Sequence, residues 1–158
     1  DETFVISDSY EIMSPSLSKL LDKATRITGS PSFRECAMDG PLVIVLEDDF
    51  ANAWGLSIVL QDWGYRTVIG DSVGPVFEKL ADQGITPQAA VCDFHLAEGE
   101  NGVSAAARLQ ERYGSDLPVV IMTGSGGTTA RRHAREYRFP VLNKPVDPDM
   151  LHTYLPAS

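Results

Sequence analysis

The chain has 158 residues, a mass of 17.2 kDa and a formal net charge of -9. This length suits one domain with a short extension and excludes two full domains. With 43% hydrophobic and 22% charged residues, the composition is that of an ordinary globular protein, which excludes a disordered, fibrous or disulfide-rich chain. The acidity predicts that the chain as a whole binds neither nucleic acid nor an anionic membrane.

Short apolar runs and sparse cysteines predict a soluble, cytoplasmic protein. No apolar run of the sequence approaches the ~20 residues of a membrane-spanning helix, and residues 4–6 are too few for a secretory signal. The two cysteines, Cys36 and Cys92, form neither a disulfide framework nor a CxxC metal motif. Because the first residue is Asp1 and not Met, we expect a fragment of a longer chain or a trimmed one.

Residues 1–40 form the first of two predicted units, an N-terminal extension or linker. Ser14-Pro15 opens an amphipathic helical pattern, whose apolar face is made by Leu17, Leu20, Leu21, Ala24 and Ile27. One interpretation is a linker or docking helix that covers the following domain. The other is a dimerisation helix or the tail of a preceding module.

Residues 41–158 form the second predicted unit, in which short β-branched runs alternate with helical patterns. The expected strands are 42–46, 65–69, 89–92, 118–122 and 141–142. The expected helices are 52–63, one that starts after Asp71 or Ser72 and ends at Gly84, 103–113, 128–137 and 147–155. This alternation predicts a doubly wound α/β domain with a parallel sheet. Five such units complete the domain, and we expect no output module beside it.

Polar side chains follow four of the five expected strands. They are Glu47-Asp48-Asp49 after the first, Asp93 after the third, Thr123-Gly124 after the fourth and Asn143-Lys144-Pro145 after the fifth. The carboxyl ends of parallel strands meet at one edge of the sheet, where such folds bind ligands, so we expect these groups to converge.

The converging groups predict phosphoryl chemistry assisted by a cation. Clustered carboxylates repel one another unless a cation lies among them, and Mg²⁺ prefers such oxygen ligands. The lysine ammonium, the Thr123 hydroxyl and the Gly124 amide are donors for an anionic group. An aspartate between Mg²⁺ and lysine can attack a phosphoryl group and form an aspartyl phosphate.

In this order and at these strand ends, Glu47-Asp48-Asp49, Asp93, Thr123 and Lys144-Pro145 resemble the receiver domain of two-component response regulators. The resemblance covers about residues 41–155 and implies a flavodoxin-like fold with a five-stranded parallel sheet in the order 2-1-3-4-5. It implies a phosphoacceptor signalling domain of a phosphorelay, which switches partner binding. The implied partner is a histidine kinase or histidine phosphotransfer protein, and the only reactions catalysed are the domain's own phosphorylation and dephosphorylation.

The resemblance also implies a metal site around the phosphoacceptor, Asp93. Asp49 is the expected direct Mg²⁺ ligand, and Asp48 the expected ligand through water. The main-chain carbonyl of His95 is the remaining expected metal ligand from the protein. Glu47 is interpreted as a bystander.

The phosphate site that the resemblance implies takes two side chains and two amides. Lys144 pairs with a phosphate oxygen, and Thr123 moves toward the phosphate with the start of the following helix. The amides of Phe94 and Gly124 bind other phosphate oxygens.

Two local features of the sequence differ from the commonest receivers. The loop 97–102 resembles that of receivers attached to hybrid histidine kinases. The family's aromatic switch residue falls on Val141 or Leu142, and neither is aromatic.

Two other functions stay open for the same residues. One is a small-molecule phosphatase or phosphotransferase with an aspartate nucleophile. Such an enzyme needs a second acid two residues after the nucleophile, where this chain has His95. A non-phosphorylated interaction scaffold does not need the intact acid, hydroxyl and lysine set. The histidines, His95, His133 and His152, lack the spacing of zinc ligands.

The fourth helix is basic against the trend of the chain. Its expected arginines are Arg131, Arg132, Arg135 and Arg138. We expect the face between the fourth and fifth helices to bind a second copy or a downstream protein, and not nucleic acid.

Overall fold

The computed structural model of the chain describes residues 4–6, 40–124 and 126–158. The predicted amphipathic helix of residues 14–27 lies outside these residues. Among the helices that the structure describes, none is long and apolar enough to cross a membrane.

The centre of the fold is a six-stranded sheet with the order β1-β3-β2-β4-β5-β6. Its strands are β1 (Phe4–Ile6), β2 (Leu42–Leu46), β3 (Arg66–Gly70), β4 (Ala89–Asp93), β5 (Val119–Thr123) and β6 (Val141–Asn143). The strands β2 to β6 are parallel and confirm the predicted flavodoxin-like order 2-1-3-4-5. The sixth strand, β1, is not among the expected strands, and it pairs antiparallel with β3 at the edge of the sheet.

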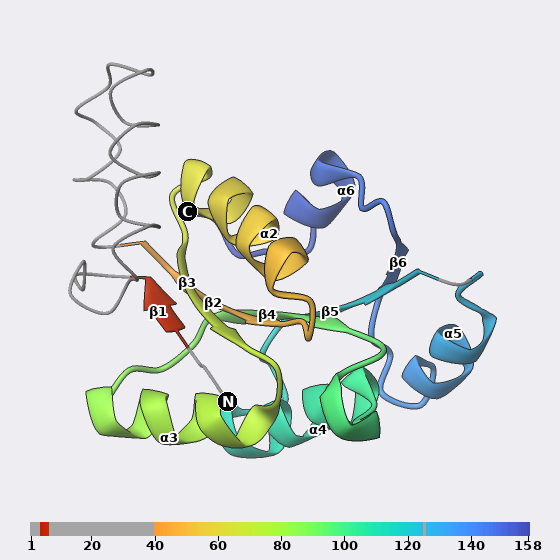
Figure 1. The fold of residues 1–158 in the computed structure, drawn as a ribbon, viewed down its shortest axis with the longest axis horizontal. Helices are drawn as coiled ribbons and strands as arrows, with labels where there is room; N and C mark the ends of the chain where they lie inside the picture. The colour runs from red at the N-terminus through yellow and green to blue at the C-terminus, as the bar shows by residue number, and fades with distance from the viewer. Residues whose placement is uncertain (1–3, 7–39, 125) are drawn as a thin grey trace.

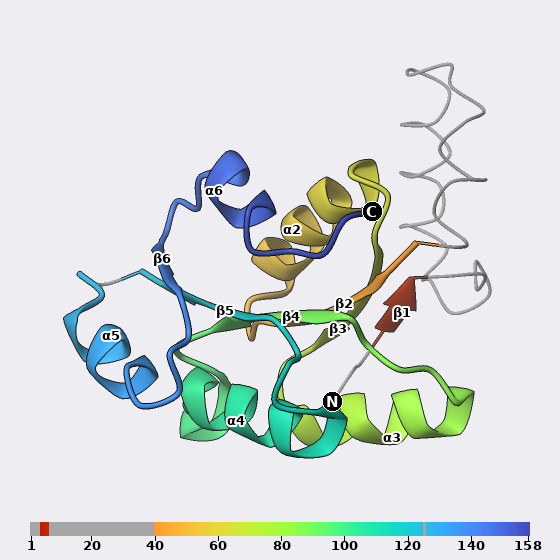
Figure 2. The ribbon, with the colours of Figure 1, turned by 180° about the vertical axis from the view of Figure 1, so that it is seen from behind.

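Helices cover both faces of the sheet, as Figures 1 and 2 show. They are α2 (Phe50–Asp62), α3 (Val73–Gln83), α4 (Gly102–Tyr113), α5 (Thr128–Ala134) and α6 (Pro148–His152). The helices α2 and α6 lie on one face, and α3, α4 and α5 lie on the other. All five residues of β2, β4 and β5 are therefore buried, which explains their unbroken apolar runs.

Local sequence signals set most of the helix boundaries. The side chains of Asp49, Asn101 and Asp147 accept hydrogen bonds from the first-turn amides of α2, α4 and α6. The helix α3 ends at Gly84, whose φ of 63° lies in the left-handed region that favours glycine. We predicted this end of α3 from the glycine, and it is confirmed.

The helix α5 is shorter than the sequence predicts. It ends at Ala134, and Arg138 lies beyond it with a φ of 58°. Arg135 caps the helix, so Arg131 and Arg132 are the arginines within α5. The prediction of one basic helix from 128 to 137 is therefore wrong at its C-terminal end, because the chain turns sharply there to enter β6.

Candidate functional site

The carboxyl ends of β2, β4, β5 and β6 bring the predicted polar groups to one edge of the sheet. Asp93 and Thr123 are the last residues of β4 and β5, and both side chains are buried. Glu47 follows β2 directly and is only 4% exposed. Its amide donates to the carbonyl of Gly70 at 3.0 Å, so the backbone pairing of β2 with β3 continues to this residue.

Lys144 connects two of the carboxylates at this edge. Its ammonium donates to Glu47 Oε2 at 2.6 Å and to Asp93 Oδ2 at 2.8 Å. The amide of Lys144 donates to the carbonyl of Thr123 at 2.8 Å, which fixes the backbone of the lysine beside the end of β5. Charge-assisted hydrogen bonds of this length are strong, so the lysine is held against Asp93.

Burial and charge shift the pKa values of this cluster. Burial raises the pKa of Glu47, and the nearby charge of Asp93 adds to the rise, while the hydrogen bond from Lys144 opposes it. Burial alone would lower the pKa of Lys144, but its hydrogen bonds to Asp93 and Glu47 outweigh this effect and raise it. The lysine is therefore a fixed positive charge at neutral pH.

Three carboxylates at this edge lie close enough to share one cation. Oxygen atoms of Glu47, Asp48 and Asp93 are all within 4.8 Å of one another. Hard carboxylate oxygens are the ligands that Mg²⁺ prefers, and Asp48 is exposed and faces the solvent from which the ion's remaining waters come. The residues present thus fit Mg²⁺ by their chemistry and by their spacing.

The group of carboxylates that lie together does not include Asp49, which we predicted as a metal ligand. Its Oδ1 accepts from the amide of Asn52 at 2.9 Å and caps α2, and Asp49 is not in the group of three. Glu47, interpreted from the sequence as a bystander, takes that place. Because α2 begins at Phe50, Asp49 is the N-cap, and the two acids before it remain at the end of β2.

Of the two amides predicted to bind phosphate, that of Phe94 has a partner within the sheet. The Phe94 amide already donates to the carbonyl of Met122 at 2.8 Å, as part of the pairing between β4 and β5. The next amide, that of His95, lies 3.4 Å from Asp93 Oδ1. His95 N–H is therefore the amide beside the Asp93 carboxylate. Gly124 is exposed at the end of β5, where we predicted its amide to bind phosphate.

The segment after Asp93 is held close to the acceptor. His95 pairs with Asn101 in an isolated antiparallel bridge, and its ring is exposed. A Cβ on Gly102 would lie 1.9 Å from the carbonyl oxygen of Asp93, so only glycine lets α4 start this near to β4. This close approach keeps the backbone of His95 beside Asp93, and its carbonyl stays a predicted metal ligand.

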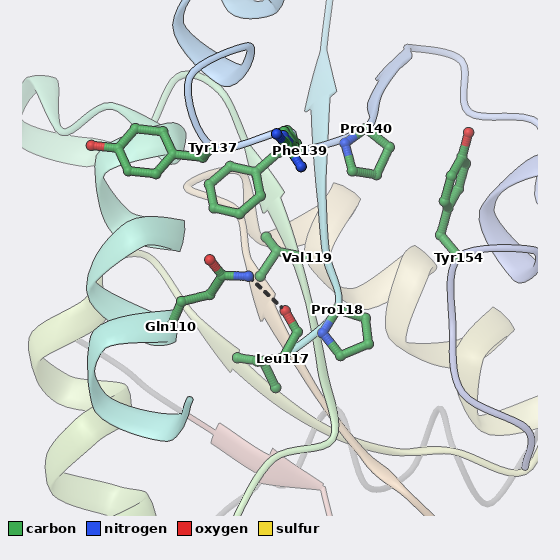
Figure 3. A pocket seen from close by; sticks show the side chains of 9 residues that line it. Gln110, Leu117, Pro118, Val119, Tyr137, Phe139, Pro140 and Tyr154 are labelled. Carbon is green, nitrogen blue, oxygen red and sulfur yellow. Dashed lines mark hydrogen bonds between the residues drawn. The ribbon is translucent and has the colours of Figure 1, made fainter. Parts of the chain in front are cut away.

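A separate hollow of about 210 Å³ lies away from this cluster, and Figure 3 shows its lining. Leu117, Pro118 and Val119 line it at the amino end of β5. Tyr137, Arg138, Phe139 and Pro140 line it before β6, with Gln110 and Tyr154 beside them. The amino ends of the strands lie at the edge of the sheet opposite Asp93, so this hollow takes no part in the chemistry of the cluster.

Comparisons with known proteins identify the family of the chain. The family model of the response regulator receiver domain matches residues 43–156. No curated protein in the comparison matches the chain.

Solved structures of receivers share the fold. The signal receiver domain of a modulated diguanylate cyclase from Desulfovibrio desulfuricans is 30% identical, with a TM-score of 0.60, and the match covers 73% of this chain and 90% of that one. A response regulator from Chloroflexus aurantiacus is 24% identical, with a TM-score of 0.63 and coverage of 73% and 93%. A Burkholderia pseudomallei response regulator, solved with a phosphorylated aspartic acid, a calcium ion and citrate, is 21% identical, with a TM-score of 0.62 and coverage of 73% and 66%.

The family match covers most of the chain and includes every element that contributes to the cluster around Asp93. Members of this family interact in general with histidine kinases or phosphotransfer proteins. The chain belongs to the response regulator receiver domain family.

Proposed function

We propose that this chain is the phosphoacceptor domain of a two-component phosphorelay and that Asp93 receives the phosphoryl group from a phosphohistidine donor. The observation that carries the proposal is that the Asp93 carboxylate accepts a hydrogen bond from the Lys144 ammonium, at 2.8 Å, and lies within 4.8 Å of the carboxylates of Glu47 and Asp48. A nucleophilic carboxylate that is paired with a fixed cation and shares a cation site with two other carboxylates suits attack on a phosphoryl group.

The transfer needs few covalent changes. A carboxylate oxygen of Asp93 bonds to phosphorus as the bond from phosphorus to the donor imidazole breaks, and the leaving nitrogen takes up a proton. Lys144 stabilises the charge that spreads over the phosphoryl oxygens, with the amides of His95 and Gly124 and the Thr123 hydroxyl as further donors. Water later hydrolyses the aspartyl phosphate, so the domain catalyses only its own phosphorylation and dephosphorylation.

Glu47, Asp48 and Asp93 would hold Mg²⁺, with the His95 carbonyl as a further ligand. When bound, the ion offsets the mutual repulsion of the carboxylates and neutralises charge on the transferred group. The phosphorylated aspartic acid and the calcium ion in the Burkholderia pseudomallei protein, which has the same fold, support this assignment.

The direct test is intact mass after incubation with acetyl phosphate. With Mg²⁺ we expect the mass of one added phosphoryl group, because acetyl phosphate replaces the donor protein. Chelation of Mg²⁺ with EDTA should prevent the gain, and readdition should restore it. No mass gain with Mg²⁺ present would contradict the proposed function.

The outer face of α2 is where we expect the donor protein to dock. This face is apolar and exposed at Phe50, Ile58 and Val59, with exposed fractions of 51%, 46% and 37%. It begins directly after Asp48 and Asp49, so a protein that brings a phosphohistidine to Asp93 must lie over its first turn. The ring of Phe50 stacks on that of Trp54, which extends the apolar surface along the helix.

Ile58→Glu is therefore expected to slow transfer from a phosphohistidine protein by about tenfold or more, because a charge would be buried at the contact. Labelling by acetyl phosphate, which needs no docking surface, should keep its wild-type rate. Ser104→Glu, an exposed position on α4 at the other face of the sheet, is the matched control. Equal transfer rates in Ile58→Glu and the wild type would exclude this docking face.

A further inference from the structure

A second hollow, of about 500 Å³, lies at the amino ends of β2, β3 and β4, at the edge of the sheet opposite Asp93. The described residues that line it precede β2, start β3, or connect the end of α3 to β4; they are Gly40, Pro41, Arg66, Gly84, Ile85, Thr86 and Gln88. Among these residues, Arg66 alone carries a charge. A ligand of this hollow therefore needs a negative charge to complement it.

The guanidinium of Arg66 has no hydrogen-bond or ion-pair partner among the residues that the structure describes. Its Nε is buried and makes no hydrogen bond. The terminal nitrogens, Nη1 and Nη2, stay accessible, because Nε is the one buried side-chain nitrogen of Arg66 without a partner. Buried polar groups in folded proteins are nearly always paired, so this arginine calls for an explanation. Its covered stem and open terminal nitrogens are the arrangement of a binding group.

Acceptors that line the hollow are already occupied by other donors. The carbonyl of Pro41 accepts from the amide of Arg66 itself, at 2.9 Å. The side chain of Gln88 ties the segment before β4 in place, since its Oε1 accepts from the amide of Leu42 and its Nε2 donates to the carbonyl of Thr86 at 2.9 Å. These bonds fix the walls of the hollow before any ligand binds and leave the guanidinium to a group from outside.

The chemistry of the hollow favours a carboxylate over a phosphate. A guanidinium pairs with a carboxylate through two parallel N–H···O bonds. Phosphate sites often use the amides at a helix N-terminus, but here it is the C-terminal end of α3, at Gly84, that lines the hollow. The partial negative charge of that end opposes a doubly charged ligand more than a singly charged one. Pro41 and Ile85 are half-buried and give the hollow an apolar wall.

We propose that this hollow binds a small organic monocarboxylate, whose carboxylate pairs with Arg66 and whose hydrocarbon part lies against Pro41 and Ile85. The Thr86 hydroxyl, which also lines the hollow, is a further donor for the carboxylate. The site lies at the opposite edge of the sheet from Asp93, so the binding neither requires phosphoryl transfer nor follows from it.

The experiment uses butyrate as the probe and butyramide, which has nearly the same shape without the charge, as its control. Each is titrated into the full chain, with sodium chloride added to the butyramide samples to equalise the ionic strength. Amide NMR spectra follow the hollow at Arg66, Ile85, Thr86 and Gln88. The same titrations are made with Arg66→Gln and Arg66→Lys, and with Arg112→Gln, which removes an exposed arginine of α4.

In the wild type, butyrate should shift these amides in a saturable way, with the millimolar affinity expected of so small a probe. It should bind about tenfold or more tightly than butyramide, because only the charged probe pairs with the guanidinium. Arg66→Gln should weaken butyrate binding by about tenfold or more. Arg66→Lys, which keeps the charge without the planar fork, should weaken it by about threefold. Arg112→Gln should bind butyrate as the wild type does.

Thermal melts show whether each variant is folded, and Arg66→Lys decides the question if Arg66→Gln does not fold. The proposal is wrong if butyramide binds as tightly as butyrate, or if the Arg66 variants bind butyrate as the wild type does. Tighter binding of inorganic phosphate than of butyrate would overturn the assignment of a carboxylate. None of these outcomes changes the mass gain from acetyl phosphate, so the proposed function of Asp93 and the site at Arg66 can fail separately.

Discussion

Asp93→Asn is expected to abolish the mass gain from acetyl phosphate. The amide of asparagine is not a nucleophile at neutral pH, and the other carboxylates of the cluster are poorly placed to replace Asp93. Glu47 is buried and hydrogen-bonded to Lys144 at 2.6 Å, and Asp48 lies on the exposed side of the group. We expect labelling below a hundredth of the wild-type rate, which is the order of loss when a nucleophile is removed from an active site.

The same variant should fold normally, because asparagine has nearly the shape of aspartate and Lys144 keeps its hydrogen bond to Glu47. A thermal melt by circular dichroism serves as the control. The loss of the negative charge at position 93 should also move the pKa of Glu47 toward its ordinary value, although burial will still raise it. Undiminished labelling of Asp93→Asn would mean that another residue is the acceptor.

The parallel sheet and the edge that carries the cluster could be predicted from the sequence because local signals agree there. The run Leu42–Leu46 is fully buried, Asp93 ends the apolar segment of β4, and Lys144 directly follows the last residue of β6. In a parallel sheet, topology alone brings such ends together, so no distance has to be known in advance. The ion pair between Lys144 and Asp93 shows that these two strand ends do lie together.

The choice among three consecutive acids could not be made from the same pattern. A shift by one residue decides which side chains stay at the end of β2 and which one enters the first turn of α2. One signal was present in the sequence: an aspartate before an apolar helical run is a typical N-cap, and Asp49 lies three residues before Asn52. We predicted that this helix starts at Asn52, two residues late, and therefore did not assign Asp49 as its N-cap.

Other differences arise from contacts between residues far apart in the chain. A three-residue apolar run is too short to indicate a strand, and β1 forms a strand because it pairs with β3. The hydrogen bonds of α5 between His133 and Asn101 and between Arg131 and Asn143 join residues that are 32 and 12 positions apart, so a local sequence pattern does not reveal them. The division of the chain at Pro41 into an extension and a domain stays a prediction.

Asp48→Asn and Asp49→Asn form a matched pair that tests the metal assignment. Each variant removes one negative charge, and the two positions are adjacent, so long-range electrostatic effects on Mg²⁺ are nearly equal. Asp48→Asn removes one of the three carboxylates that lie within 4.8 Å of one another and should weaken Mg²⁺ binding by about tenfold or more. Asp49→Asn keeps the cap of α2, because asparagine caps as well as aspartate, and should leave Mg²⁺ affinity within about threefold of wild type.

Calorimetric titration with Mg²⁺ measures this difference directly, and a third variant separates capping from metal binding. Asp49→Ala should lower the free energy of unfolding by about 1 kcal/mol through loss of the cap, again with little change in Mg²⁺ affinity. Equal losses of Mg²⁺ affinity in Asp48→Asn and Asp49→Asn would restore Asp49 as a ligand. That result would require the first turn of α2 to open when the ion binds, since the Asp49 carboxylate is held there by the amide of Asn52.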